Sequence, residues 1–159
     1  MLFTETERHP TFSSLLDRAT RLLAQRDHSV EELKEKIRLS VWRSQQRGAV
    51  EHAAIDETAL ASVIAWCEEN GWLDDQRFTR LFIQSRGRNG YGPQRIRQDL
   101  QQKGVERELI SQELAETDID WQQQAENVAR KKYGHKWPTE AREKARLQRF
   151  LHSRGFLME

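Results

Sequence analysis

The sequence is poor in cysteine and proline and has no long apolar run. Its single cysteine, Cys67, excludes an internal disulfide, which fits a reducing compartment. No stretch approaches the roughly 18 uncharged apolar residues of a membrane span. The first ten residues, MLFTETERHP, carry acids where a signal peptide carries basic residues and a hydrophobic run. We therefore expect a soluble, cytoplasmic protein.

Apolar residues are also scarce for a chain of 159 residues, and the mean hydropathy is −0.88. Counted with glycine and without tyrosine, the apolar share is about 40%, below the roughly 45–50% of a typical globular domain. The net charge is only +1. Because the remaining apolar residues are regularly spaced, these values favour a folded but elongated, surface-rich protein over a disordered one.

The apolar residues follow a helical period along most of the chain. Leu15, Ala19, Leu22 and Leu23, for example, share one face of a helix. No alternating run of β-branched residues predicts a strand, so we expect an all-α protein. The predicted helices cover residues 12–25, 30–37, 56–69, 75–88, 93–103, 106–116, 119–133 and 139–154, and a ninth begins at Phe156.

Capping residues define most of these helix starts. Ser29 with Glu32 has capping-box spacing, and Asp56, Asp74 or Asp75, and Asp118 precede three further helices. Pro93 stands where the first turn of a helix tolerates it. Residues 38–55 lose the helical period and are predicted to be an aperiodic linker.

Three groups of three helices account for this order. Similar helix ends, ENGWLDD at Glu69, QKGVERE at Gln102 and SRGFLME at Ser153, each place a glycine before a hydrophobic residue. We predict an elongated tandem array of three-helix repeats over 1–73, 74–117 and 118–159, stacked to complete a shared core. The third repeat is expected to be incomplete at its C-terminus.

The near-zero net charge hides an uneven distribution. Residues 1–73 are acidic overall, whereas in 76–103 Asp99 is the only acid and in 130–154 only Glu140 and Glu143 are acidic. Basic side chains dominate both later segments and form a surface suited to phosphates or an acidic protein. The candidate partner- or DNA-binding residues are Arg86, Arg88, Arg95, Arg97, Lys103, Lys131, Lys132, Lys136, Arg142, Arg146 and Arg149.

The turn Gly90-Tyr91-Gly92-Pro93 lies among these arginines. The helix start that follows it would aim backbone N–H groups at the basic region, which favours an anion. The turn lacks the lysine and glycine spacing of a phosphate loop, so a tight interhelical turn is the alternative.

Catalytic and metal sites are not indicated. Asp74-Asp75 and Asp118/Asp120 are the only acid clusters able to hold Mg²⁺ for a nuclease, and helix capping explains both. No histidine stands at metal-ligand spacing, and Cys67 lies on an apolar stripe as a core thiol. We predict no enzyme activity and no cofactor. Trp42 and Trp137 remain candidates for stacking on bases or a partner.

Several segments together resemble the RecX family of bacterial recombination regulators. They are LLDRATRLLAQRDHSVEELKEKI from Leu15, GWLDDQRFTRLFIQSR from Gly71, GYGPQRIRQDLQQKG from Gly90, RKKYG from Arg130 and KARLQRFLHSRGF from Lys144. The resemblance implies tandem three-helix repeats. It also implies a protein without a catalytic site that binds the RecA recombinase, chiefly as its nucleoprotein filament. We expect the protein to be a monomer.

The same resemblance implies inhibition of RecA ATPase, strand exchange and coprotease activity, and so modulation of homologous recombination and the SOS response. Single- and double-stranded DNA are further expected partners. The alternative is a free-standing DNA-binding module in which PQRIRQDLQQKG from Pro93 enters a major groove, although the net charge is low for such a domain.

Overall fold

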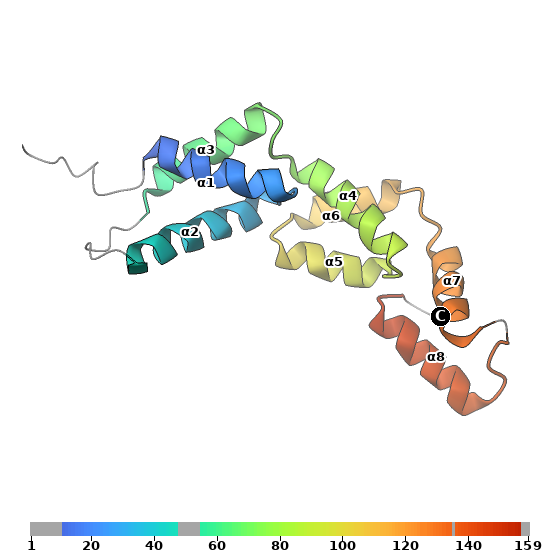
Figure 1. Cartoon of the computed structure of the whole chain (residues 1–159). Coiled ribbons are helices and arrows are strands. Elements are labelled where there is room, and N and C mark those ends of the chain that lie inside the picture. Colours follow the sequence, from blue (N-terminus) through green and yellow to red (C-terminus); the bar gives the residue numbers. More distant parts are fainter. Residues whose placement is uncertain (1–10, 48–54, 135, 157–159) are drawn as a thin grey trace, which may run out of the picture. The chain divides into compact units, whose positions relative to one another are not determined.

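The computed structural model describes residues 11–47, 55–134 and 136–156, which form helices and no strand (Figure 1). This confirms the all-α prediction. The helices are α1 (Phe12–Gln25), α2 (Val30–Arg47), α3 (Glu57–Glu69), α4 (Asp75–Arg88), α5 (Pro93–Gln102), α6 (Arg107–Glu116), α7 (Trp121–Tyr133) and α8 (Ala141–Ser153). Every described helix is too short or too polar to span a bilayer.

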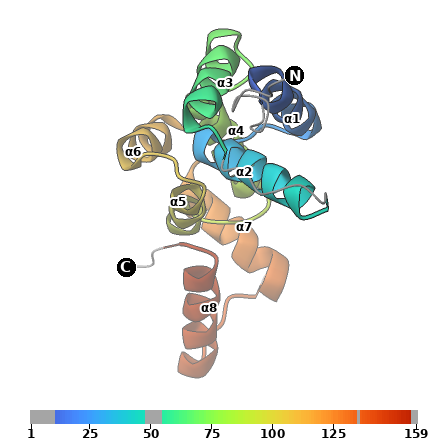
Figure 2. The same cartoon turned by 90° about the vertical axis from the view of Figure 1, so that its left-hand side faces the viewer.

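The chain divides into two compact units, residues 1–78 (unit 1) and 79–159 (unit 2). In unit 1, helices α1, α2 and α3 contact one another pairwise (Figures 1 and 2). Their apolar faces form one core, and Cys67 is fully buried in it, as the spacing predicted. The other buried core residues are Leu15, Ala19, Leu33, Ile37, Val41, Leu60, Val63, Ile64 and Leu73.

The prediction of a linker from residue 38 is wrong for residues 38–47, because α2 continues to Arg47. Val41 extends the apolar stripe of Leu33 and Ile37 by one turn and is 3% exposed. Leu39 and Trp42 in the same segment are apolar but exposed, so apolar residues on the outer faces obscure the helical period in the sequence. Residues 48–54 of the predicted linker lie outside the described residues.

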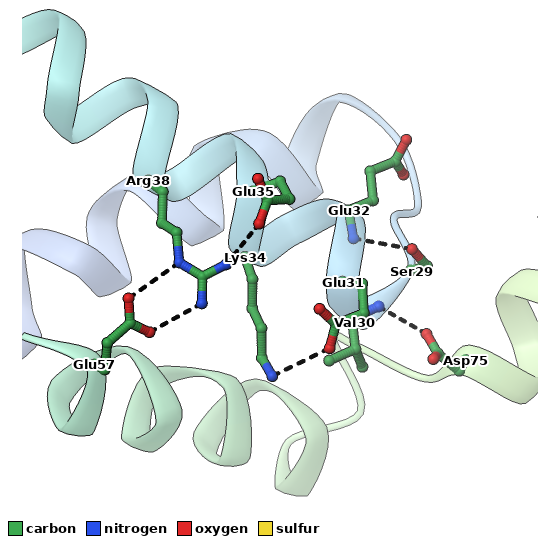
Figure 3. A network of polar contacts seen from close by, with 9 residues as sticks. All are labelled: Ser29, Val30, Glu31, Glu32, Lys34, Glu35, Arg38, Glu57 and Asp75. Atoms are coloured by element: carbon green, nitrogen blue, oxygen red, sulfur yellow. Dashed lines mark hydrogen bonds and ion pairs between the residues drawn. The ribbon is translucent and has the colours of Figure 1, made fainter. Parts of the chain in front are cut away.

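Side-chain caps hold the helix starts of unit 1. Ser29 Oγ accepts a hydrogen bond from the Glu32 N–H at 3.1 Å, and Asp56 Oδ1 accepts from the Thr58 N–H at 2.9 Å. A second cap for α2 comes from α4, where Asp75 Oδ1 accepts from the Val30 N–H at 2.8 Å (Figure 3). The beginning of α4 is thereby tied to unit 1.

In unit 2, α5 packs on α6 and α7 packs on α8. Ala125 and Ala129 of α7 meet Leu147 and Leu151 of α8, together with Phe156, in a small core. The predicted cap Asp118 is wrong, because Asp120 caps α7 by accepting from Gln123 N–H at 3.1 Å. Of the predicted ninth helix, only Phe156 is described, and it is not helical; residues 157–159 lie outside the described residues.

Two glycines end helices in unit 2 as the repeated sequence predicted. Gly104 and Gly155 have φ of 77° and 96°, the left-handed region that glycine adopts without strain. The next residue then turns back, so that Val105 N–H donates to the Leu100 carbonyl at 3.1 Å and Phe156 N–H donates to the Leu151 carbonyl at 2.9 Å. Both hydrophobic side chains are buried.

Candidate functional site

The turn between α4 and α5 places one tyrosine ring among three arginines. The guanidinium carbon of Arg154 lies 5.1 Å from the centroid of the Tyr91 ring, and those of Arg86 and Arg95 each lie 5.7 Å away. These distances fall within the range of cation–π attraction. Arg86 lies in the last turn of α4, Arg95 lies in the first turn of α5 and Arg154 follows α8, so three elements converge on one ring.

The same arrangement continues to a ring on either side. Arg86 also lies 5.2 Å from the Phe82 ring centroid, and Lys103 lies 6.0 Å from it. On the other side, Arg154 lies 5.4 Å from the Phe150 ring centroid, and Lys132 lies 4.1 Å from it. We call this set the cation–aromatic row. It consists of Phe82, Tyr91 and Phe150 with Arg86, Arg95, Lys103, Lys132 and Arg154.

Two backbone hydrogen bonds join the two sides of the row. The Gly92 N–H donates to the Arg154 carbonyl at 2.6 Å, and the Gln94 N–H donates to the Gly155 carbonyl at 3.0 Å. The first turn of α5 therefore binds the chain that follows α8. The expectation that this helix start presents N–H groups to a bound anion is wrong at these two positions, because carbonyl oxygens of the same chain already occupy them.

The row carries an excess of positive charge. Arg95 pairs with Asp99, Nε to Oδ1 at 3.4 Å, whereas no described acid forms an ion pair with Arg86 or Arg154. Arg95 is exposed and the Tyr91 ring is half-buried. Unneutralised guanidinium groups attract phosphate or carboxylate, and the accessible edge of an aromatic ring offers a base a surface for stacking.

The structure brings four of the predicted residues into the row: Arg86, Arg95, Lys103 and Lys132. Arg97 points elsewhere, because its Nη1 donates to Ser111 Oγ of α6 at 2.9 Å. The other predicted residues are exposed outside the row. They are Arg88, Lys131, Lys136, Arg142, Arg146 and Arg149.

Three of these exposed arginines form a stripe on α8. Arg142, Arg146 and Arg149 have the i, i+4, i+7 spacing of one helix face, opposite the buried Leu147 and Leu151. The stripe is a second basic surface of unit 2 and belongs to the same helix as Phe150.

The sequence prediction missed Tyr91, Phe82, Phe150 and Arg154 as site residues. Tyr91 lay in the turn that the sequence marked, and Arg154 lay in the basic segment 130–154. Neither signal showed that the two residues meet, because their contact depends on α5 binding the end of α8.

The aspartates considered for a nuclease have structural partners. Asp74 Oδ1 accepts from the Arg77 N–H at 3.0 Å at the start of α4, Asp75 caps α2 and Asp120 caps α7. Within residues 11–47, 55–134 and 136–156, no group of three His, Cys, Asp or Glu side chains is arranged to hold a metal ion. Burial raises the pKa of the Cys67 thiol, which disfavours the reactive thiolate.

Comparisons with known proteins agree on one family. The sequence model for the second three-helix domain of RecX matches residues 74–114, and that for the third matches residues 118–159. The regulatory protein RecX of Escherichia coli K12 (strain DH10B) is 48% identical over 154 residues, which cover 97% of this chain and 91% of that protein. The RecX of Escherichia coli O1:K1 gives the same values.

Two solved structures share the fold. The crystal structure of RecX from Lactobacillus salivarius aligns with a TM-score of 0.71 at 16% identity, covering 92% of this chain and 88% of that one. A second crystal structure of regulatory protein RecX aligns with a TM-score of 0.66 at 19% identity, covering 92% of this chain and 67% of that one.

Proposed function

The chain belongs to the RecX family of regulatory proteins, and from this premise we propose that it binds the RecA recombinase and its filaments on DNA. Binding inhibits RecA ATPase, strand exchange and coprotease activity, and so modulates homologous recombination and the SOS response in the cytoplasm. The protein acts as a monomer, by binding and without catalysis or a cofactor.

The observation that supports this proposal most directly is the cation–aromatic row. It sets five cations along three rings, and Arg95 among them pairs with Asp99. A filament on DNA presents phosphates and acidic protein side chains together. Guanidinium groups pair with both, and Tyr91 adds a ring that packs on a base or an apolar side chain.

Inhibition follows from a difference in affinity. A bound protein shifts the filament only as far as it prefers one arrangement of RecA subunits over another. A protein that contacts neighbouring subunits in the filament groove stabilises one arrangement and slows the cycling that ATP hydrolysis requires. The row and the Arg142–Arg146–Arg149 stripe are the surfaces of unit 2 that we assign to this contact.

The test is the affinity for RecA filaments compared with bare DNA over a series of salt concentrations, alongside RecA's DNA-dependent ATPase. We expect binding to filaments to be tighter and less sensitive to salt than binding to bare DNA, because contacts to phosphate alone weaken steeply as the salt concentration rises. ATPase inhibition should follow filament occupancy. Equal affinity for filament and bare DNA would overturn the proposal.

Equal affinity for filaments and bare DNA would favour a free-standing DNA-binding module. The stacked cations and rings of the row are the observation that supports this alternative. Insertion of α5 into a major groove is a weaker form of this alternative, since Arg97 is engaged with Ser111 and Ile96 and Leu100 are buried. The salt series separates the two functions, because a DNA-binding module loses affinity for both targets in parallel.

A further inference from the structure

Cations of unit 1 fall into two sets, and the first set is paired with acids. Arg38 forms a two-pronged contact with Glu57, Nη2 to Oε2 at 2.9 Å and Nε to Oε1 at 3.2 Å, and also contacts Glu35 (Figure 3). Lys34 pairs with Glu31 at 3.3 Å. The guanidinium of Arg38 lowers the pKa of the Glu57 carboxyl. This face of α2 is neutralised within the molecule.

The second set, Arg18 of α1 with Arg43 and Arg47 of α2, lies at another face of α2 and has no acid partner among the described residues. Arg18 donates to the hydroxyl groups of Ser40 at 2.5 Å and Ser44 at 3.2 Å. Arg43 and Arg47 are exposed, and no hydrogen bond or ion pair joins either to a described residue. Within residues 11–47 and 55–78 these positive charges have no acid partner, although residues 1–78 are acidic overall.

A groove of about 590 Å³ runs along this second face. Leu22 and Leu39 contribute its apolar lining, and Lys36, Arg43 and Arg47 contribute its cations. No acid lines it. Leu39 is 43% exposed, and Trp42, which precedes Arg43, is 56% exposed. An apolar side chain as exposed as Leu39, beside cations that have no described acid partner, is typical of an interaction surface.

We propose that this groove binds an acidic amphipathic helix of a protein partner. Lys36, Arg43 and Arg47 extend over about 16 Å of α2 at 1.5 Å per residue, which is the span of about three turns of a helix lying alongside. A partner helix with leucines facing Leu22 and Leu39 and with glutamates at its flanks satisfies both the apolar lining and the charge. The inference concerns unit 1 and does not depend on the function proposed above.

The aliphatic lining favours a peptide over a nucleic acid. Single strands bind where rings alternate with cations, as in the cation–aromatic row of unit 2. None of the described residues that line the groove of unit 1 is aromatic, and Leu22 and Leu39 offer a base no stacking surface. Lys36 is also turned partly inward, with Nζ 3.2 Å from Nε2 of the buried His28.

The experiment uses the full chain and a fluorescein-labelled synthetic helix of about 18 residues, long enough to hold helical structure. One face of the peptide carries leucines, with glutamates at the flanks, and binding is followed by fluorescence anisotropy. A second peptide replaces each glutamate with lysine, and a labelled oligothymidylate is the third probe. We expect the glutamate peptide to bind and the lysine peptide to bind at least tenfold more weakly.

Variants locate the binding. Arg43→Glu combined with Arg47→Glu should weaken binding of the glutamate peptide at least tenfold. Leu39→Ser should also weaken this binding, without changing the charge of the protein. The matched control for Arg43→Glu alone is Lys34→Glu, which makes the same single charge reversal on the opposite face of α2, about 180° around the helix axis. Circular dichroism verifies helix content, and Arg43→Gln with Arg47→Gln replaces the reversal if that content falls.

Equal loss in the Lys34→Glu control would overturn the proposal, because the effect would then be one of net charge. Unchanged peptide binding in the Arg43/Arg47 variant would overturn it as well. Oligothymidylate could instead bind more tightly than the peptide and lose its binding in the Arg43/Arg47 variant. That result would show that the groove binds a nucleic acid and not an acidic helix.

Discussion

The backbones of Gly92 and Gly155 lie so close that a Cβ atom on Gly92 would fall 2.5 Å from the Gly155 carbonyl oxygen. That carbonyl accepts the N–H of Gln94, and the carbonyl before it accepts the N–H of Gly92. This contact fixes Arg154 beside Tyr91 and so assembles the cation–aromatic row.

Replacing Gly92 by alanine should therefore destabilise unit 2. The added methyl meets backbone atoms, which cannot rotate away, and overpacking of this kind costs about 1–3 kcal/mol. Urea unfolding should show a lower midpoint, and hydrogen exchange at the Gln94 amide should accelerate. Gln94→Ala keeps both backbone bonds and should change the free energy of unfolding by less than about 0.5 kcal/mol. An unchanged midpoint for Gly92→Ala contradicts the close approach.

Arg154→Glu should weaken filament binding more than Arg97→Glu. Both variants make the same change of charge in unit 2, but only Arg154 lies beside the rings of the row. Loss of a charge-assisted contact is worth about 1.5–3 kcal/mol, or about tenfold or more in affinity. The measurement is inhibition of RecA's DNA-dependent ATPase over a range of protein concentrations. Equal losses in both variants would show that only net charge matters.

The Tyr91 ring, rather than its hydroxyl, is expected to carry binding to single-stranded DNA. Tyr91→Phe retains the surface for stacking and for the surrounding guanidinium groups, so its affinity should stay close to that of the unaltered protein. Tyr91→Leu should lose about 1–3 kcal/mol, the typical worth of one base on one ring. Fluorescence anisotropy with a labelled oligothymidylate measures both. Similar affinities for the leucine variant and the unaltered protein would remove Tyr91 from the contact.

Asp75 offers a test of the cap that α4 supplies to α2. Burial raises the pKa of its carboxyl, and the hydrogen bond from the Val30 N–H partly offsets this. Asp75→Asn keeps an oxygen acceptor and removes the buried charge, so stability at pH 7 should be retained. Asp75→Ala leaves the Val30 N–H without its acceptor and should cost about 0.5–2 kcal/mol in urea unfolding. Equal stabilities of the alanine and asparagine variants would argue against the cap.

His28 should make the stability of unit 1 depend on pH. It is 2% exposed, its Nδ1 lies 2.8 Å from the Arg26 carbonyl oxygen, and its Nε2 faces the ammonium of Lys36. Burial lowers the pKa of His28 below its ordinary value, so the unfolded chain binds the proton more readily than the folded one. The contribution of neutral, buried His28 to the free energy of unfolding is complete above a pH of about 6.5. It is lost as the pH falls through the lowered pKa.

Urea unfolding between pH 7.5 and pH 5 (roughly the range over which histidine titrates) measures this loss. His28→Gln should flatten the profile in that range, whereas His152→Gln, at an exposed position, should leave it unchanged. A profile that His28→Gln does not alter would assign the pH dependence to other groups.

The helices were largely predictable because their signals are local. Asp56 and Pro93 stand at the starts of α3 and α5 as the sequence indicated, and Gly104 and Gly155 end helices in the predicted conformation. The misses arose where a distant contact decides the outcome. Arg18 reaches the hydroxyl groups of Ser40 and Ser44 and helps to hold the part of α2 that was predicted to be a linker.

The candidate site was predictable in charge and only partly in composition. Arg86, Arg95, Lys103 and Lys132 were among the basic residues that the sequence marked, and they lie along the row. Arg97 has the same charge and lies two residues after Arg95, yet it contacts Ser111. Charge is a property of each residue, whereas the direction of a side chain depends on the face of the helix that packs against its neighbours.

The sequence by itself thus determined an all-α chain, most of its helix boundaries and an excess of positive charge in residues 74–159. Each of these depends on residues within a few turns of one another. Only the tertiary structure decided that Tyr91 meets Arg154, that Asp75 caps α2, and that the cations on one face of α2, unlike those on another, pair with acids among the described residues. Those outcomes require segments far apart in the chain to come together, and packing of the helices is what brings them there.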